Sequence, residues 1–329
     1  MRVTFFLDED GLDRLRGLDP DAHWREFQLG EHAWVLQTYL RLTRAGHPAE
    51  LVNVPPDEGL IVFHAKQAKA LARRLPRRRD VVLVGARADN REPLIADFEV
   101  LQNGRFADGR RRFYMPHWPQ PGLIPRDPSR GTALARLVYK GFDRNLHPAF
   151  RSAEWRRFLA GRGIEWVTDS MAFAGRATDK MAVEWPDFRQ VDAVLAVRPD
   201  ERSQRTAKPA TKLLNAWLAG VPALLGPEYA FRELRRSELD YLEVGSLAEA
   251  EEAVRRLQAD PGLYRAMVEN GRARGAEYTV EATVRRWAEL LYETIPARAA
   301  RRSWTRRVPL PLKVPARALA RLLTLRPAR

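Results

Sequence analysis

The chain of 329 residues contains no cysteine. Disulfide bonds and thiolate metal sites are therefore excluded, and a reducing compartment such as the cytoplasm is expected. Long apolar runs are also missing, because the run at residues 2–7 is too short for a secretory signal and no window approaches the ~20 residues of a membrane-spanning helix. These absences predict a soluble, cytoplasmic protein.

Acidic residues are absent from residues 297–329, which hold ten basic residues. The net charge of the chain is +14, so the remainder carries 14 − 10 = +4. Such a charge is typical of proteins that bind nucleotides, nucleic acids or anionic membranes. Because most of the excess lies in this tail, specific nucleic-acid binding by the body is not expected.

The tail itself has an amphipathic pattern at residues 315–325. Leu319, Leu322 and Leu323 recur near one face of a helix, and Arg317 and Arg321 lie one turn apart on another. This pattern predicts a peripheral contact of residues 297–329 with an anionic membrane surface at the inner face. A disordered basic extension is the alternative.

Apolar runs alternate with helical patterns through the first third of the chain. Strands are expected at residues 2–7, 49–54, 60–64, 80–84, 96–102 and 112–117, and helices at 31–45 and 66–75. Such alternation is typical of a parallel sheet covered by helices. A proline-rich run from residue 116 to 128 predicts a linker, and a domain boundary near Gly131.

The second half repeats the alternation. Strands are expected at residues 137–142, 164–168, 191–197, 221–225 and 241–244, and helices at 154–161, 208–219, 230–236, 247–259 and within 263–295. The predicted fold is α/β, with a Rossmann-like domain at residues 1–130, a second at 131–296 and the tail at 297–329. Ligands of such sheets bind at the carboxyl ends of the strands, so a cleft between the domains is expected to bind the ligand.

One stretch, AKPATKLLNAWLAGVPALLGPE at residues 207–228, carries the clearest functional signal. Pro209 suits the first turn of a helix, Thr211 offers a local cap, and Gly220 is placed to end it. Lys208 and Lys212 near the start of that helix predict an anion site, because free N–H groups and the helix dipole both favour phosphate. Two solvated lysines are the alternative.

Together with the later segment DYLEVGSLAEAEEAVRRLQADPGLYRAMVENG, this stretch resembles the second domain of GT-B glycosyltransferases, especially the large retaining family that uses nucleotide-activated sugars. The resemblance covers about half of the chain. It implies a metal-independent hexosyltransferase-like enzyme without a cofactor, which takes a nucleotide-sugar donor and a glycan or lipid-linked acceptor in cell-surface polysaccharide or glycolipid assembly. The helix at 208–219 would then hold the donor.

The same family places a ribose-binding glutamate where this chain has Asn215. An amide can still bind a hydroxyl group, so Asn215 stays a donor-binding candidate. Arg198 follows a predicted strand and either faces the ligand or pairs with Asp200 or Glu201. Glu228 either accepts from the ribose or caps the next helix.

Candidates for catalysis in the first domain are His32, which opens a predicted helix after Gly30, and Asp97 or His117. Histidine titrates near neutral pH and can act as a general base, although a lone histidine is more often structural. Arg130 and Arg144 flank the first strand of the second domain and either touch phosphate or lie on the surface.

The acidic turn at residues 8–10, Asp-Glu-Asp, allows two further hypotheses, a Mg²⁺-binding pair or a phosphatase motif. Each needs partners that the sequence does not place, so an exposed turn is expected and no metal site is predicted. Two alternatives to a transferase remain. A non-catalytic nucleotide-sugar-binding scaffold is favoured by Asn215, and a nucleic-acid-binding protein only by net charge.

Overall fold

The computed structural model describes residues 1–28, 30–76, 80–171, 184–199 and 208–301, together with residues 312, 314, 315, 317 and 318. The chain forms two compact units. The first consists of Met1–Pro20, Glu26–Pro116 and Thr283–Arg329, and the second of Asp21–Arg25 and His117–Ala282. By this division, the boundary expected near Gly131 falls inside the second unit.

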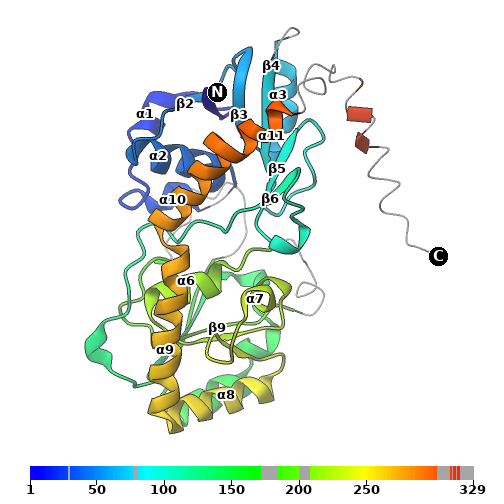
Figure 1. Cartoon of the computed structure of the whole chain (residues 1–329). Coiled ribbons are helices and arrows are strands. Elements are labelled where there is room, and N and C mark those ends of the chain that lie inside the picture. Colours follow the sequence, from blue (N-terminus) through cyan, green and yellow to red (C-terminus); the bar gives the residue numbers. More distant parts are fainter. Residues whose placement is uncertain are drawn as a thin grey trace, which may run out of the picture. The chain divides into compact units, whose positions relative to one another are not determined.

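The first unit is built on a parallel sheet of six strands in the order β2-β1-β3-β4-β5-β6. These strands are β1 Val3–Phe6, β2 Ala49–Val52, β3 Glu58–His64, β4 Asp80–Ala86, β5 Phe98–Leu101 and β6 Arg112–Tyr114. Val3–Phe6 is buried along its whole length, as expected for a strand of a parallel sheet that is covered on both faces. Figure 1 labels β2 to β6 of this sheet.

Helices cover this sheet and include one that the sequence did not predict. They are α1 Leu12–Arg16, α2 Gln37–Arg44, α3 Ala68–Arg74 and α11 Ile295–Ala300, with a π-helical turn η2 His32–Leu36 before α2 and another, η10 Glu289–Thr294, before α11. No helix was predicted at residues 11–17, but Leu12 and Leu15 bury one face of α1. In η10, the Tyr292 hydroxyl donates to the Pro48 carbonyl at 2.9 Å.

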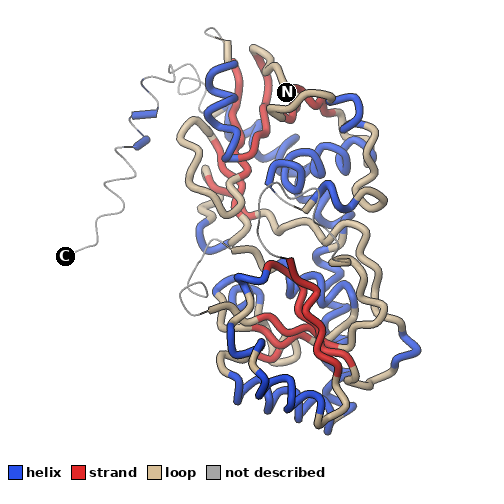
Figure 2. The backbone as a smooth tube through the Cα atoms, turned by 180° about the vertical axis from the view of Figure 1, so that it is seen from behind, coloured by secondary structure: helices blue, strands red, loops and turns tan. Residues whose placement is uncertain are grey.

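The second unit is built on a parallel sheet of five strands in the order β11-β10-β9-β7-β8. Its elements are β7 Arg136–Phe142, α4 Ala153–Ala160, β8 Glu165–Met171, β9 Ala193–Ala196, α6 Thr211–Ala219, β10 Ala223–Leu225, α7 Tyr229–Leu234, β11 Leu242–Glu243, α8 Leu247–Ala259 and α9 Pro261–Gly275, and α10 Val280–Ala288 follows α9. Figure 2 shows the strands of this sheet side by side in red. The predicted α/β class with two Rossmann-like sheets is confirmed.

Glycines let α9 pack closely on α6. A side chain at Gly271 would lie 3.0 Å from Cδ1 of Trp217, and one at Gly275 would lie 3.4 Å from Leu218. The indole N–H of Trp217 donates to the Asp240 carbonyl at 2.9 Å. This packing fixes α6, the helix that carries two of the candidate site residues.

The start of α6 differs from the prediction. The helix begins at Thr211, and Ala210 occupies the N-cap without a side-chain hydrogen bond. Pro209 therefore precedes the helix rather than lying in its first turn, and Thr211 does not cap it. Gly220 ends the helix as predicted, because its φ of 70° is left-handed and its N–H reaches the Ala216 and Trp217 carbonyls.

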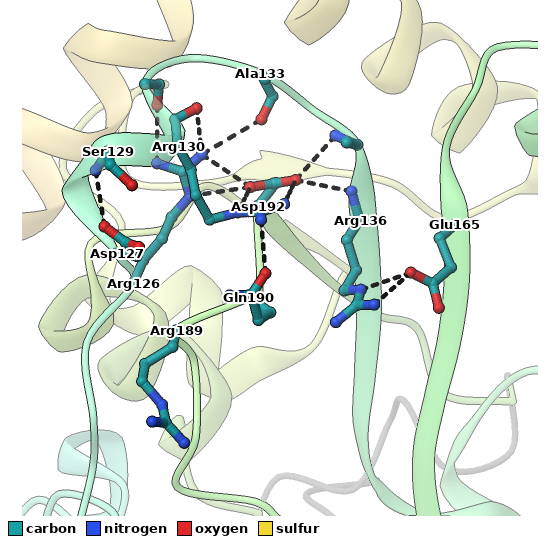
Figure 3. A network of polar contacts seen from close by, with 12 residues as sticks. Arg126, Asp127, Ser129, Arg130, Ala133, Arg136, Glu165, Arg189, Gln190 and Asp192 are labelled. Atoms are coloured by element: carbon teal, nitrogen blue, oxygen red, sulfur yellow. Dashed lines mark hydrogen bonds and ion pairs between the residues drawn. The ribbon is translucent and has the colours of Figure 1, made fainter.

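A buried carboxylate organises the amino ends of β7 and β9. Asp192 is fully buried and accepts hydrogen bonds from the guanidinium groups of Arg126 and Arg130 and from the backbone N–H groups of Ala135 and Arg136, at 2.8–3.2 Å. Figure 3 shows this network around Asp192. Arg130, considered for phosphate contact or the open surface, belongs to this network.

The few described residues of the tail lie in the first unit. Val314 packs against a core cluster that includes Phe63 and Leu71. The Arg317 guanidinium donates to the Leu94 and Ala96 carbonyls and to the Asp97 carboxylate. Residues 319–325, which carry the predicted leucine face, lie outside the described residues. Within the described part of the chain, the helices are too short or too polar to cross a bilayer.

Candidate functional site

Three neighbouring strands of the second sheet deliver polar residues at their carboxyl ends. Lys140 and Gly141 lie at the end of β7, Arg198 follows β9, and Glu228 follows β10. These strands are adjacent and parallel, so the segments that follow them gather at one edge of the sheet. Lys212, in the first turn of α6, joins them there.

Arg198 and Glu228 form an ion pair at this edge. The Arg198 Nε lies 2.6 Å from the Glu228 Oε2, with the two side chains only 11% and 4% exposed. Burial raises the pKa of the Glu228 carboxyl, while Arg198 and, more weakly, Lys212 and Lys208 act to lower it.

The structure bears on the alternatives for Glu228 but leaves those for Arg198 open. Glu228 occupies the N-cap position of α7, but its side chain makes no capping hydrogen bond, so the capping alternative is wrong. The alternative partners of Arg198, Asp200 and Glu201, lie outside the described residues.

Lys212 lies in a narrow socket beside this pair. Its Nζ donates to the Lys140 carbonyl and lies 4.7 Å from the centre of the Tyr139 ring. Burial lowers the pKa of Lys212 to about 7, with Arg198 acting in the same direction and Glu228 opposing it. The Lys212 amino group is therefore only partly protonated near neutral pH.

Gly141 makes this socket possible. Its φ is 153°, and a side chain there would place Cβ 2.6 Å from the Lys212 Nζ and 2.9 Å from the Tyr139 hydroxyl. Real Cβ atoms do not approach heavy atoms so closely, so only glycine fits without a shift of its neighbours. Neither Gly141 nor Tyr139 was predicted as a site residue; the one signal was a glycine within the predicted strand LVYKGF.

The remaining donor-site candidates, Lys208 and Asn215, lie on either side of Lys212 in sequence. Lys208 is close enough to Glu228 to lower its pKa. Asn215 is 8% exposed, and its Oδ1 accepts a hydrogen bond from the Gln120 N–H at 3.1 Å. The structure therefore brings Arg198, Lys208, Lys212 and Glu228 together and ties the Asn215 oxygen to the proline-rich segment.

In the first unit, His32 is held by the acidic turn that follows β1. Its Nε2 lies 2.9 Å from Oε2 of Glu9, and its Nδ1 lies 3.1 Å from the Glu26 carbonyl. Burial acts to lower the pKa of His32, but the hydrogen bond and the charge of Glu9 outweigh it, so the pKa is raised above 6.5. Glu9 belongs to the turn expected to be merely exposed, and its contact with His32 was not foreseen.

A second histidine ends β3 near His32. His64 is fully buried, its Nδ1 lies 3.7 Å from Oε2 of Glu31, and the Asn90 amide lies 3.5 Å from its Nε2. Burial lowers the pKa of His64 to about 4, so the ring is neutral at ordinary pH. The carboxyl ends of β1 and β3 therefore carry a polar cluster of Glu9, Glu31, His32 and His64.

The other candidates, Asp97 of the first unit and His117 and Arg144 of the second, have structural partners of their own. Asp97 precedes β5, and its Oδ2 accepts from the Leu83 N–H at 3.1 Å while its Oδ1 pairs with Arg317. The structure therefore gives Asp97 partners different from those of His32. The His117 Nδ1 lies 2.8 Å from the Trp118 carbonyl, and the Arg144 guanidinium lies 5.9 Å from the centre of the Phe142 ring.

Comparison with known proteins defines the fold. The sequence matches no protein-family model and no curated protein. Solved structures do match: HepE from Anabaena in complex with UDP-glucose is 15% identical, with a TM-score of 0.51 over 89% of this chain and 99% of HepE. AviGT4, a glycosyltransferase involved in avilamycin A biosynthesis, is 15% identical, with a TM-score of 0.50 over 89% of this chain and 97% of AviGT4.

The chain has the GT-B glycosyltransferase-like fold. This confirms the fold expected from the resemblance of the second domain. Each sheet of this GT-B chain ends in a polar cluster at its carboxyl edge, one of them rich in cations around Lys212 and the other built on two histidines. Among the described residues, no group of His, Asp and Glu side chains is arranged to hold a metal ion.

Proposed function

We propose that this protein is a glycosyltransferase that moves a sugar from a nucleotide-diphosphate donor to a glycan or lipid-linked acceptor. The observation that carries the proposal is the convergence of Arg198, Lys208, Lys212 and Glu228 at the carboxyl ends of β7, β9 and β10. In an α/β sheet this is where a nucleotide binds. Two proteins of the same fold support it, since HepE was solved with UDP-glucose and AviGT4 is described as a glycosyltransferase.

The donor's charge and its hydroxyl groups match different members of this cluster. Lys208 and Lys212 neutralise the diphosphate, and their charge also stabilises the nucleotide as it leaves the sugar. Glu228 accepts from the ribose hydroxyls, with its orientation fixed by Arg198. Asn215 has its oxygen on Gln120, which leaves its amide N–H groups as the donors for a ribose contact.

The acceptor is assigned to the polar cluster of the first unit. His32 is the first candidate base: its Nδ1 faces the Glu26 carbonyl, so its Nε2 takes the proton of the acceptor hydroxyl once that hydroxyl replaces Glu9 there, and the nearby Glu9 carboxylate stabilises the imidazolium that results. Asp97 is the second candidate base, although both of its oxygens already have partners. Cationic side chains take the place of a metal, so we expect transfer without a metal or a cofactor.

Cell-surface polysaccharide or glycolipid assembly would place such an enzyme in the cytoplasm at the inner face of the membrane. The charge of residues 297–329 supports this location, since each basic residue near an anionic bilayer contributes about 1 kcal/mol. Co-sedimentation with phosphatidylglycerol vesicles tests it. The full chain should bind and a chain ending at residue 296 should not.

Calorimetric titration with UDP, GDP and their sugars tests the main proposal. At least one nucleotide should bind below millimolar concentration, and Lys212→Met should weaken it. A second candidate function, a non-catalytic nucleotide-sugar-binding protein, is favoured by Asn215 in place of the family glutamate. Release of free sugar from the bound donor, or its transfer, would exclude that candidate if it disappears in Lys212→Met.

A further inference from the structure

We propose that Lys212 is a proton-gated cation, which takes up a proton from the solvent when a nucleotide diphosphate binds beside its socket. This inference rests on the proposed function, because the diphosphate is the ligand of that function. It assigns to Lys212 a role that a permanently charged lysine would not have, namely a coupling of donor affinity to pH.

The socket supplies the geometric basis. Among the described residues, the Lys212 Nζ has one hydrogen-bond acceptor, the Lys140 carbonyl, and one ring face, that of Tyr139. The Tyr139 hydroxyl donates to the Phe142 carbonyl at 2.7 Å, which fixes the ring. A carbonyl accepts from a neutral amine as well as from an ammonium, so the socket holds both forms of the side chain.

The charges around the socket are already paired with one another. Lys140, on β7, pairs with Asp169 at 2.8 Å, and Arg198 pairs with Glu228 at 2.6 Å. Among the residues that the structure describes, no carboxylate lies within ion-pair distance of Lys212. An ammonium there is therefore repelled by two cations, and Glu228, whose charge Arg198 offsets, compensates only in part.

Other titratable groups face the same place. Lys208 precedes α6 and acts on Glu228, while Asp143 and Arg151, after β7, act on Tyr139. Burial raises the pKa of the Tyr139 phenol, which keeps it neutral. Burial lowers the pKa of Lys212 and raises that of Glu228, so variants of Lys212 decide which group takes up the proton.

Binding of a diphosphate would favour the charged form of Lys212 over the neutral form. The ligand adds negative charge to a site with excess positive charge, so the charged form of Lys212 is stabilised and its pKa rises. Only the protonated fraction of the empty site binds well, and above pH 7 that fraction falls about tenfold per pH unit. The affinity for the nucleotide should therefore fall with this protonated fraction.

Proton uptake also favours catalysis in the forward direction. A nucleotide diphosphate that has left the sugar carries more negative charge on its terminal phosphate than it did in the donor. A protonated Lys212 therefore binds the departing group more strongly than the intact donor, which is the requirement for lowering the barrier.

The test is calorimetric titration of the full chain with UDP or GDP, whichever binds, at pH 8 in Tris and in HEPES. The two buffers release different heats when they lose a proton, so the difference in observed heat gives the number of protons taken up. We expect net uptake of a proton on nucleotide binding at pH 8, and an affinity that is several-fold weaker at pH 8.5 than at pH 7.5.

Three variants assign the proton. Lys212→Met should bind more weakly, take up no proton and lose the pH dependence. Lys212→Arg keeps a charge at all pH values and should bind without proton uptake, so it serves if the methionine variant fails to fold. Lys69→Met, which removes an exposed lysine of α3, should behave like the wild type.

The outcomes separate this inference from the proposed function. Nucleotide binding without proton uptake at pH 8, or uptake that persists in Lys212→Met, overturns the inference and leaves the proposed function standing. A failure of both nucleotides to bind at millimolar concentration overturns both.

Discussion

Replacing Gly141 by alanine tests whether the socket of Lys212 is built as the structure shows it. The new Cβ would lie 2.6 Å from the Lys212 Nζ and 2.9 Å from the Tyr139 hydroxyl, at a backbone φ of 153°. A non-glycine residue in a sparsely populated backbone region costs about 1–3 kcal/mol. If the Tyr139 hydroxyl must leave the Phe142 carbonyl, about 1 kcal/mol more is lost.

The effect on stability and the effect on nucleotide affinity are measured separately. Thermal unfolding should show a midpoint lowered by roughly 2–4 °C for each kcal/mol. Nucleotide titration should show an affinity lowered about tenfold, because loss of one charge-assisted hydrogen bond costs about 1.5–3 kcal/mol. The flexible end of Lys212 moves more easily than the Tyr139 ring, so the affinity is expected to respond at least as strongly as the stability.

Gly163→Ala is the matched control for this prediction. Gly163 has a left-handed φ of 70°, but a side chain there would meet nothing within 4 Å. The control should lower the unfolding midpoint through backbone strain alone and leave the nucleotide affinity unchanged. If Gly141→Ala binds nucleotide like the control, the socket is not part of the site.

Three further predictions concern the rest of the molecule. Asp192→Ala leaves the buried Arg126 and the partly exposed Arg130 without their carboxylate and should lower the free energy of unfolding in urea by about 3–5 kcal/mol; a loss below about 1 kcal/mol would contradict the role of this network. Glu9→Gln should lower the pKa of His32 in an NMR titration, and an unchanged pKa would show that the pair does not form. Because the folded pKa of His32 is raised, the stability from this pair is complete below pH 6.5 and is lost as the pH rises through the folded value. Arg317→Ala removes the anchor on Asp97 and should make the C-terminal segment several-fold more sensitive to chymotrypsin, whereas an unchanged rate would refute that anchor.

Most of the fold could be predicted from local patterns. The run VTFF and the pattern of residues 247–259 each specify their element without help from the rest of the chain, and α8 was placed with its correct bounds. The start of α6 could not be placed, because Pro209 is as compatible with a residue before a helix as with its first turn. Helix α1 was missed because its apolar face consists of only Leu12 and Leu15.

The site was predictable in its residue types but not in its contacts. Lys212 and Arg198 could be chosen because each lies at the end of a strand or the start of a helix. The pairing of Arg198 with Glu228 joins residues 30 positions apart and depends on the order β10-β9-β7, which no local pattern reveals. For the same reason, the sequence did not indicate that Glu9 would lie against His32 or Gly141 against Lys212.

The most direct test of the central claim is a titration of the wild-type chain and Arg198→Gln with UDP, GDP and their sugars, each followed by calorimetry. The proposal predicts that at least one nucleotide binds below millimolar concentration and that Arg198→Gln weakens it at least tenfold, because the substitution also releases Glu228. Binding that is absent in the wild type, or equal in the two proteins, would contradict a nucleotide site at the carboxyl edge of the second sheet.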